Sequence, residues 1–214
     1  MEENNGTATL SRKEREKKIR EREILLAART LFAERGFHNT TLDEIAHKAE
    51  FAKGTIYNYF ANKDELFIGI IENIFDELHT LTTEAMSIEG AGAREKMIEY
   101  AKAIITHSKE HSDLFRLMMQ EAPRQGLNSF SDKVNHFHER EQESREIVAK
   151  TLAEEIAKGT VINRDPNALA FLFDGMLRYY CMHSVKQLTP AKSLGIEHAA
   201  ELMVTVFFDG ITHS

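Results

Sequence analysis

The hydrophobic residues of this chain recur with the period of an α-helix from residue 16 almost to the end. The first apolar stripe is formed by Ile24, Ala28, Leu31 and Phe32. These spacings place the four side chains on one face of a helix over residues 16–35, and Gly36 follows as a typical helix stop. No stretch alternates apolar and polar residues over a useful strand length. We therefore predict an all-α fold.

Two capping boxes, TLDE at residues 41–44 and NKDE at residues 62–65, mark the starts of further helices. In such a box the first and last side chains satisfy backbone groups that the helix start leaves unpaired. We predict helices over residues 41–50 and 53–60, and a longer one from residue 62. Further helical patterns cover residues 93–109, 112–121, 129–158, 166–187 and 190–208. The sequence SIEGAGA at residues 87–93 is the expected loop between two parts of the chain.

Charge is distributed unevenly along the chain. Residues 10–24 hold seven basic and four acidic residues, although the whole chain has a net charge of −7. Residues 1–61 carry eleven basic and ten acidic residues, so the rest of the chain carries a net charge of −8. A local basic surplus is what a polyanionic partner attracts, and the overall sum does not exclude one.

The remaining composition limits the class of protein. Hydrophobic residues make up 42% of the chain, which is enough for a packed core. The single cysteine, Cys181, excludes an internal disulfide framework, and we interpret it as a packing residue. No apolar run reaches the roughly 20 residues that cross a bilayer, and the polar start has no secretory-signal core. We expect a cytoplasmic protein that does not bind a membrane.

The segment FAKGTIYNYFANKDEL, residues 51–66, combines aromatic and basic groups in a short space. Two helices joined by a tight turn form a helix-turn-helix, and Ile56 and Phe60 supply its interior. The residues left facing outward or sideways are Lys53, Thr55, Tyr57, Asn58 and Tyr59. Gly54 lets a backbone approach another surface closely. Tyrosine hydroxyls and lysines reach phosphate oxygens, and Lys53, Thr55 or Asn58 can contact base edges, so double-stranded DNA is the predicted partner.

These motifs resemble those of the TetR family of transcriptional regulators. The similarity rests on TLDEIA at residues 41–46, KGTIYNYF at 53–60 and NKDEL at 62–66, and it extends over about residues 20–78. It implies a homodimer that binds a palindromic operator, represses transcription and is released by a small-molecule effector. It further implies phosphate contacts from Thr41, Tyr57, Tyr59 and Lys63, and positions nearest the bases for Lys53, Gly54 and Thr55. The basic stretch before the first helix is longer than in the shortest members.

The resemblance also implies a division of the chain into three parts. We expect a flexible basic extension over residues 1–15, a DNA-binding domain over 16–62, and an effector-binding and dimerisation domain over 63–214. Candidate effector-pocket residues are Phe115, Met118, Met119, Phe137, Phe173, Met176 and Tyr180. Methionine and phenylalanine line adaptable apolar cavities well, which favours an apolar or aromatic effector. The candidate dimer interface comprises Leu172, Met176, Tyr180, Ala199, Ala200, Met203 and Phe207.

Other classes of function remain open alternatives. One is a DNA-binding regulator controlled by a protein partner without a small-molecule effector. Another is an all-α enzyme or metal carrier that uses His107 and His111, whose i, i+4 spacing suits metal ligation. With ten histidines in the chain such pairs also arise by chance, and no set of nucleophile, base and orienting group is evident. We therefore predict no catalytic activity, no cofactor and no metal.

Overall fold

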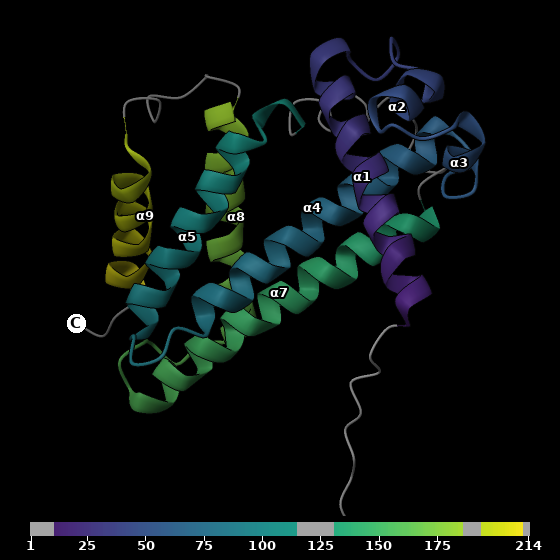
Figure 1. The fold of residues 1–214 in the computed structure, drawn as a ribbon. Helices are drawn as coiled ribbons and strands as arrows, with labels where there is room; N and C mark the ends of the chain where they lie inside the picture. The colour runs from purple at the N-terminus through teal and green to yellow at the C-terminus, as the bar shows by residue number, and fades with distance from the viewer. Residues whose placement is uncertain (1–10, 115–130, 186–193, 212–214) are drawn as a thin grey trace, which may run out of the picture. The chain divides into compact units, whose positions relative to one another are not determined.

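The computed structural model describes residues 11–114, 131–185 and 194–211, and of residues 131–137, Val185 and Ile211 it describes the backbone alone. These residues form helices with no strand among them, which confirms the all-α prediction (Figure 1). The chain divides into two compact units, Met1–Ile70 and Ile71–Ser214, which we call the N-terminal unit and the C-terminal unit. None of the described helices is both long enough and apolar enough to cross a membrane.

The helices of the N-terminal unit are α1 (Arg12–Arg35), α2 (Leu42–Lys48), α3 (Lys53–Tyr57) and the first turns of α4 (Lys63–Met86). Helix α1 starts one turn earlier than expected because Ser11 caps it. The Ser11 hydroxyl accepts a hydrogen bond from the Glu14 amide at 3.3 Å, and the Glu14 carboxylate accepts one from the Ser11 amide at 2.8 Å. Residues 12–15 therefore belong to the helix and not to a flexible extension.

An aromatic cluster forms the core of the N-terminal unit. The Phe37 ring lies 5.2 Å from that of Phe32 and 5.3 Å from that of Phe67. Helix α4 packs so closely here that a Cβ on Gly69 would lie 3.1 Å from side-chain atoms of Leu25 and Phe60. A side chain at this position would require its neighbours to move by a few tenths of an ångström, so glycine is the residue that fits without adjustment. The short helices α2 and α3 complete the core with the fully buried Ile45 and Ile56.

The C-terminal unit contains the rest of α4 with α5 (Ala93–Glu110), α7 (Ser131–Lys158), α8 (Pro166–Val185) and α9 (Ile196–Ile211). Helix α5 packs on α8 and α9, and α7 packs on α8. The Phe173 ring is fully buried, 6.1 Å from the Tyr100 ring and 5.1 Å from the Phe207 ring. Burying a side chain of this size contributes about 1.5–3 kcal/mol. The helix predicted over residues 190–208 begins at Ile196, and most of the one predicted over 112–121 lies outside the described residues.

Candidate nucleic-acid interface

The start of α2 is held by the predicted capping box. The Thr41 hydroxyl accepts a hydrogen bond from the Glu44 amide at 3.3 Å and donates one to the Glu44 carboxylate at 2.9 Å. The hydrogen bond from the Thr41 amide, at 2.8 Å, is the main reason why the pKa of Glu44 lies below its usual value. Thr41 is exposed, so its side chain combines this local role with access from outside.

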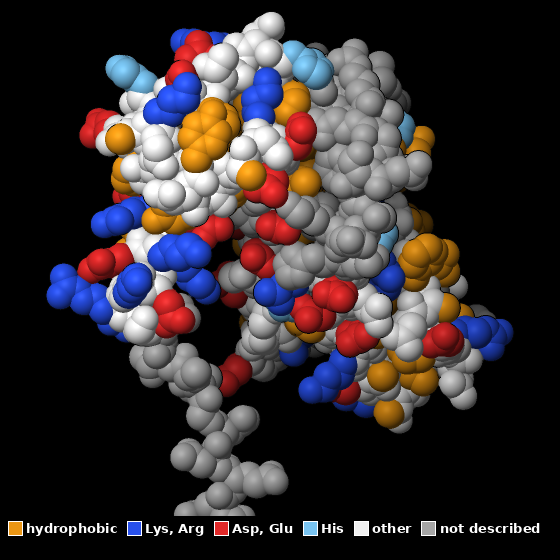
Figure 2. Space-filling view, turned by 90° about the vertical axis from the view of Figure 1, so that its right-hand side faces the viewer, with side chains coloured by type: hydrophobic (Ala, Val, Ile, Leu, Met, Phe, Trp, Pro, Cys, Tyr) orange, Lys and Arg blue, Asp and Glu red, His pale blue; other side chains and the backbone are white. Residues whose placement is uncertain are grey.

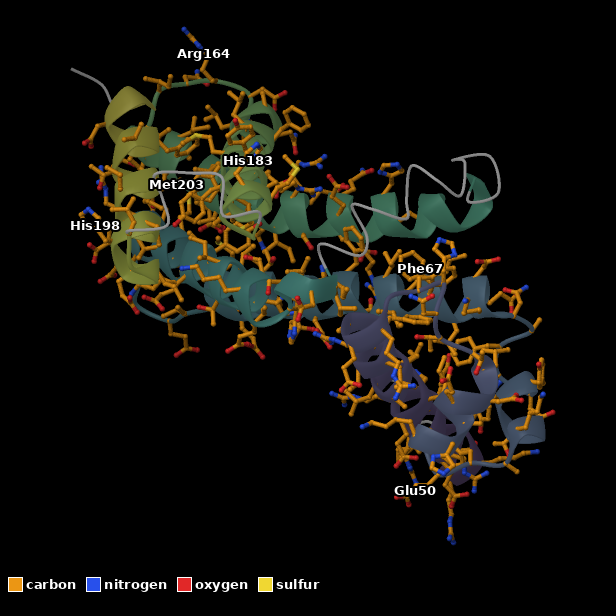
Figure 3. All side chains as sticks on the ribbon, turned by 90° about the horizontal axis from the view of Figure 1, so that it is seen from above. Glu50, Phe67, Arg164, His183, His198 and Met203 are labelled. Atoms are coloured by element: carbon orange, nitrogen blue, oxygen red, sulfur yellow. The ribbon has the colours of Figure 1, made fainter. Side chains whose placement is uncertain are left out.

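A tight turn connects α2 to α3. Glu50 has a φ of 59°, and the Phe51 amide donates a hydrogen bond to the Ala46 carbonyl at 2.9 Å. The left-handed conformation is unusual for a residue with a Cβ and costs roughly 1 kcal/mol or more. Figure 3 labels Glu50 at this turn. The turn brings α3 back against α2, as a helix-turn-helix requires.

Helix α3 buries one side and exposes the other. Ile56 is fully buried, whereas Lys53, Gly54, Tyr57 and Asn58 are exposed. A Cβ on Gly54 would meet nothing within 4 Å, so the surface there is open. Thr55 and Tyr59 are half-buried. The spacing of Ile56 and Phe60 thus predicts the inner side of this segment correctly, and the exposed residues form what we call the α3 face: Lys53, Gly54, Tyr57 and Asn58.

The α3 face carries both an aromatic ring and a positive charge. Tyr57 is 49% exposed, a large fraction for an aromatic side chain. Lys53 Nζ lies 2.8 Å from Asp43 Oδ2, and this hydrogen bond raises the pKa of Lys53. Because both side chains are 59% exposed, the ion pair adds little stability and is easily exchanged for another anion. Figure 2 views the molecule from the side of α2 and α3, where Lys and Arg side chains lie beside hydrophobic ones.

Lys63 has a different environment from the one that the resemblance implies. Its ammonium donates hydrogen bonds to the main-chain carbonyls of Phe37 at 2.6 Å, Thr40 at 2.9 Å and His38 at 3.4 Å. It also lies 4.5 Å from the centre of the Phe37 ring. An ammonium has three donors, and these carbonyls use all of them. In this structure Lys63 joins α4 to the loop after α1, and its phosphate contact stays a prediction.

Replacing Lys63 by alanine is expected to lower the free energy of unfolding by about 1–3 kcal/mol, because three carbonyls lose a charged donor. Equilibrium urea unfolding measures the loss. Lys48→Ala removes an exposed lysine from α2 and is the matched control, with an expected change within about 0.5 kcal/mol. Equal stability of the Lys63→Ala variant and the parent protein would contradict the structural role.

The basic residues before the first core position of α1 are all accessible. Every residue from Ser11 to Arg20 is exposed, and the basic side chains among them are Arg12, Lys13, Arg15, Lys17, Lys18 and Arg20. This part of α1 is a helical, net-basic segment rather than a disordered tail. Helical order presents the charges in a fixed array, which suits a polyanion.

The predicted effector residues are only partly within the described chain. Phe115, Met118 and Met119 lie outside it, and only the backbone of Phe137 is described. Phe173 lies in the core of the C-terminal unit, and Met176 is 37% exposed. The Tyr180 hydroxyl is buried without a hydrogen-bond partner among the described residues, and burial raises the pKa of Tyr180. Among the predicted pocket residues whose side chains are described, Phe173 and the hydroxyl of Tyr180 are therefore the buried groups on α8.

The residues predicted for the dimer interface lie on two different sides of their helices. Leu172 is 59% exposed on α8, whereas Ala199, Ala200, Met203 and Phe207 on α9 are buried within the unit's own core. Figure 3 shows Met203 on the side of α9 that faces the neighbouring helices, with His198 on the opposite side. Helix α5 covers that side of α9 within one chain, so these four residues belong to the core of their own unit, and the dimer interface itself stays a prediction.

Several large apolar side chains are exposed on the same two helices, and two of them, Leu172 and Met176, belong to the predicted dimer interface. We call them the exposed α8/α9 set: Phe171, Leu172, Met176, Tyr179, Leu202 and Val206. Leu202 and Val206 are 47% and 58% exposed on α9 and are spaced by one helical turn. Sequence reasoning missed Leu202 and Val206 because α9 has apolar residues around most of its circumference. Large apolar side chains gathered on exposed helix surfaces are typical of protein–protein contacts.

A charged network on α7 and α8 was also not anticipated. Arg145 and Arg178 contact the same Glu141 oxygen at 2.7 and 2.6 Å, and Arg178 contacts Asp174 at 2.8 Å. Burial raises the pKa of Asp174, and the Arg178 charge opposes that rise. The pairs within each helix have i, i+4 spacing and are visible in the sequence, but their connection across the two helices is not. The two cations are balanced by two acids.

Cys181 has the environment of a packing residue. Its side chain is 4% exposed, and burial raises the pKa of the thiol to about 11. A thiol acts as a nucleophile in its thiolate form, so this environment suppresses reactivity.

Comparison with known proteins places the chain in a clear context. The family described as "Bacterial regulatory proteins, tetR family" matches residues 24–70, within the N-terminal unit. The HTH-type transcriptional repressor KstR2 of Rhodococcus jostii is 26% identical over 201 residues, 90% of this chain and 91% of the relative. The uncharacterized HTH-type transcriptional regulator YhgD of Bacillus subtilis is 29% identical over 75% of this chain and 80% of its own. A putative TetR-family regulator from Mesorhizobium loti has a similar fold, with a TM-score of 0.72 at 23% identity, over 95% of this chain and all of that one.

Proposed function

Because the chain belongs to the TetR family of transcriptional regulators, we propose that it is a repressor that binds a palindromic operator as a homodimer and leaves it when a small effector binds. The α3 face is the observation that carries this proposal. It presents a cation, an aromatic hydroxyl and an open glycine on one short helix and an amide at its C-cap, anchored from behind by Ile56. These groups suit phosphate oxygens and base edges in a major groove.

A second copy of the chain follows from the symmetry of the proposed operator. Two α3 faces must reach half-sites about 34 Å apart, or a multiple of that distance, and a twofold axis provides this arrangement. The exposed α8/α9 set offers the apolar surface for such an isologous contact. The exposed basic part of α1 adds phosphate contacts beside each half-site.

The effector is proposed to act by shifting a population between two states of the dimer. Suppose that an effector binds more tightly to the state that does not bind DNA. It then lowers operator affinity by an amount set by its difference in affinity for the two states. Phe173 and Tyr180 support an effector of apolar or aromatic character with one polar atom, because the buried Tyr180 hydroxyl has no partner among the described residues. The balanced charges of Arg145 and Arg178 give no surplus cation for a phosphorylated effector.

The operator is best obtained by selection from random duplexes, followed by fluorescence anisotropy at several salt concentrations. We expect affinity to fall steeply as salt rises, since phosphate contacts release counterions.

Lys53→Gln is expected to weaken operator binding about tenfold per half-site. Asp43→Asn is the matched control, because it removes the acidic partner and leaves Lys53 in place. This variant should bind as tightly as the parent protein or more tightly.

Two outcomes would count against the proposal. One is that selection enriches no palindrome and that the protein binds the selected duplexes no more tightly than random ones. In that case the α3 face would not recognise a specific DNA sequence. If Lys53→Gln and Asp43→Asn weakened binding equally, the ion pair rather than the lysine would matter. Release of the bound operator by a compound from an apolar and aromatic panel supports the effector. Retention against the whole panel favours the alternative, control by a protein partner.

A further inference from the structure

Three metal-ligating side chains come together between α4 and α5 in the C-terminal unit. Glu77 is on α4, and His107 and His111 lie at the end of α5. His107 Nε2 is 2.8 Å from Glu77 Oε2, and the two imidazole rings have centroids 4.5 Å apart. One ligand atom from each residue lies within 4.8 Å of the other two. The His107/His111 pair is visible in the sequence, but the carboxylate comes from thirty residues earlier.

The chemistry of this set is that of a transition-metal site. Two imidazoles and a carboxylate are a common ligand set for Zn²⁺, with metal–ligand distances of about 2.0–2.2 Å. Ligand atoms of a tetrahedral site then lie about 3.3 Å apart. The pair formed by His107 Nε2 and Glu77 Oε2, 2.8 Å apart, would have to widen slightly, and the longest separation, at most 4.8 Å, would have to shorten by at most about 1.5 Å. Small rotations about side-chain bonds supply such movements without a change in the helices.

His107 provides an independent sign that its environment is incomplete. Its side chain is 8% exposed, and its Nδ1 atom is buried without a hydrogen-bond partner among the described residues. A buried polar atom without a partner is costly, so such atoms are uncommon and call for a cause. The nitrogen that faces Glu77 is Nε2, so Nε2 is the atom that would bind an ion shared with the carboxylate, and Nδ1 lies on the other side of the ring. The site therefore rests on the placement of Nε2, the carboxylate and His111.

The carboxylate is held in orientation by a neighbour on its own helix. Asn73 Nδ2 donates a hydrogen bond to Glu77 Oε1 at 2.5 Å, which leaves Oε2 directed at His107. Hydrogen bonds that orient a ligating side chain are a regular part of metal sites. The same residue pair, Asn73 and Glu77, has i, i+4 spacing and is therefore fixed by the helix itself.

We propose that Glu77, His107 and His111 bind one divalent transition-metal ion, with Zn²⁺ as the best match to the ligands. The three protein ligands leave a fourth tetrahedral position for water or a small anion. Binding links α4 to α5 by coordinate bonds and stabilises the C-terminal unit by mass action. The site does not depend on the proposed DNA-binding function, because none of its residues belongs to the α3 face.

The test uses the full chain, purified with its affinity tag removed and stripped of metal with a chelator. Isothermal titration with ZnCl₂ is expected to show one ion bound per chain, and CoCl₂ to give the visible absorption of a low-coordinate cobalt site. His111→Ala changes a half-buried residue at the end of α5 and should reduce Zn²⁺ affinity at least about tenfold. Glu77→Gln keeps the shape of the side chain, removes its charge, and should also weaken binding.

His138→Ala is the matched control. His138 is exposed in the same unit, and its Nδ1 atom lies 3.7 Å from a carboxylate oxygen of Glu141. The substitution therefore removes a histidine next to an acid without changing the proposed ligands. Its Zn²⁺ affinity should equal that of the parent protein. Absence of stoichiometric binding, or equal affinity of the parent and the His111→Ala variant, would overturn the proposal and leave His107 and Glu77 as a plain hydrogen-bonded pair. Circular dichroism of each variant establishes that the helices are retained.

Discussion

Replacing Gly54 by leucine is expected to reduce operator affinity by about a hundredfold while leaving the protein at least as stable. A Cβ at this position meets nothing within 4 Å, and the φ of Gly54 is not in the left-handed region, so the free protein accommodates a side chain. Leucine also has a higher helix propensity than glycine. A duplex approaching the α3 face would instead meet the added side chain at the place where the backbone is otherwise open.

Thermal unfolding and anisotropy with the selected operator measure the two effects separately. Gly54→Ala belongs in the same series and should lose less affinity, because it adds less bulk. Ala153→Leu adds apolar volume at an exposed position on α7 and should leave operator affinity unchanged. If Gly54→Leu bound the operator as tightly as the parent protein, Gly54 would not face the duplex and the assignment of the α3 face would fail.

Introducing a glutamate at Leu172 is expected to convert the proposed dimer to a monomer and to raise its dissociation constant more than about a hundredfold. Leu172 is 59% exposed in the single chain, so the substitution leaves the core intact. In a symmetric contact each copy would bury one unpaired carboxylate, and the cost is incurred twice. Val206→Glu tests α9 in the same way.

Sedimentation velocity over a range of concentrations reports the oligomeric state. Ala153→Glu places the same charge on an exposed position of α7 and should remain a dimer. Operator affinity of the Leu172→Glu variant should fall with dimerisation, since one half-site alone binds weakly. A parent protein that is monomeric at micromolar concentration, or a Leu172→Glu variant that remains dimeric, would show that the exposed α8/α9 set has another role.

Local sequence signals predicted the parts of the fold that depend on neighbouring residues. The box at Thr41 and Glu44 identified the start of α2, and Gly36 identified the end of α1. Ile56 was correctly placed on the inner side of α3 because its spacing from Phe60 is that of one helical turn. The box of Ser11 and Glu14 has the same form as the one at Thr41, and recognising it would have located the start of α1 correctly.

Other features depend on contacts between distant segments, which periodicity does not reveal. Helix α9 has apolar residues on several sides, and the position of α5 decides that Met203 is inside and Val206 outside. Lys63 lies in a motif associated with DNA contacts, but the carbonyls that it binds belong to a loop more than twenty residues earlier. Glu77 carries no signal in the sequence until the fold places it beside His107.

The boundary between the two units falls after Ile70, inside the continuous helix α4 rather than in a loop. The aromatic cluster of Phe32, Phe37 and Phe67 lies entirely before that boundary, so residues up to Ile70 bring their own core with them. A chimaera with a related regulator, joined at Ile70 in unbroken helical phase, is expected to exchange the N-terminal unit while retaining the C-terminal unit of the other parent. Gene recombination within this helix offers evolution the same route to new combinations of the two units.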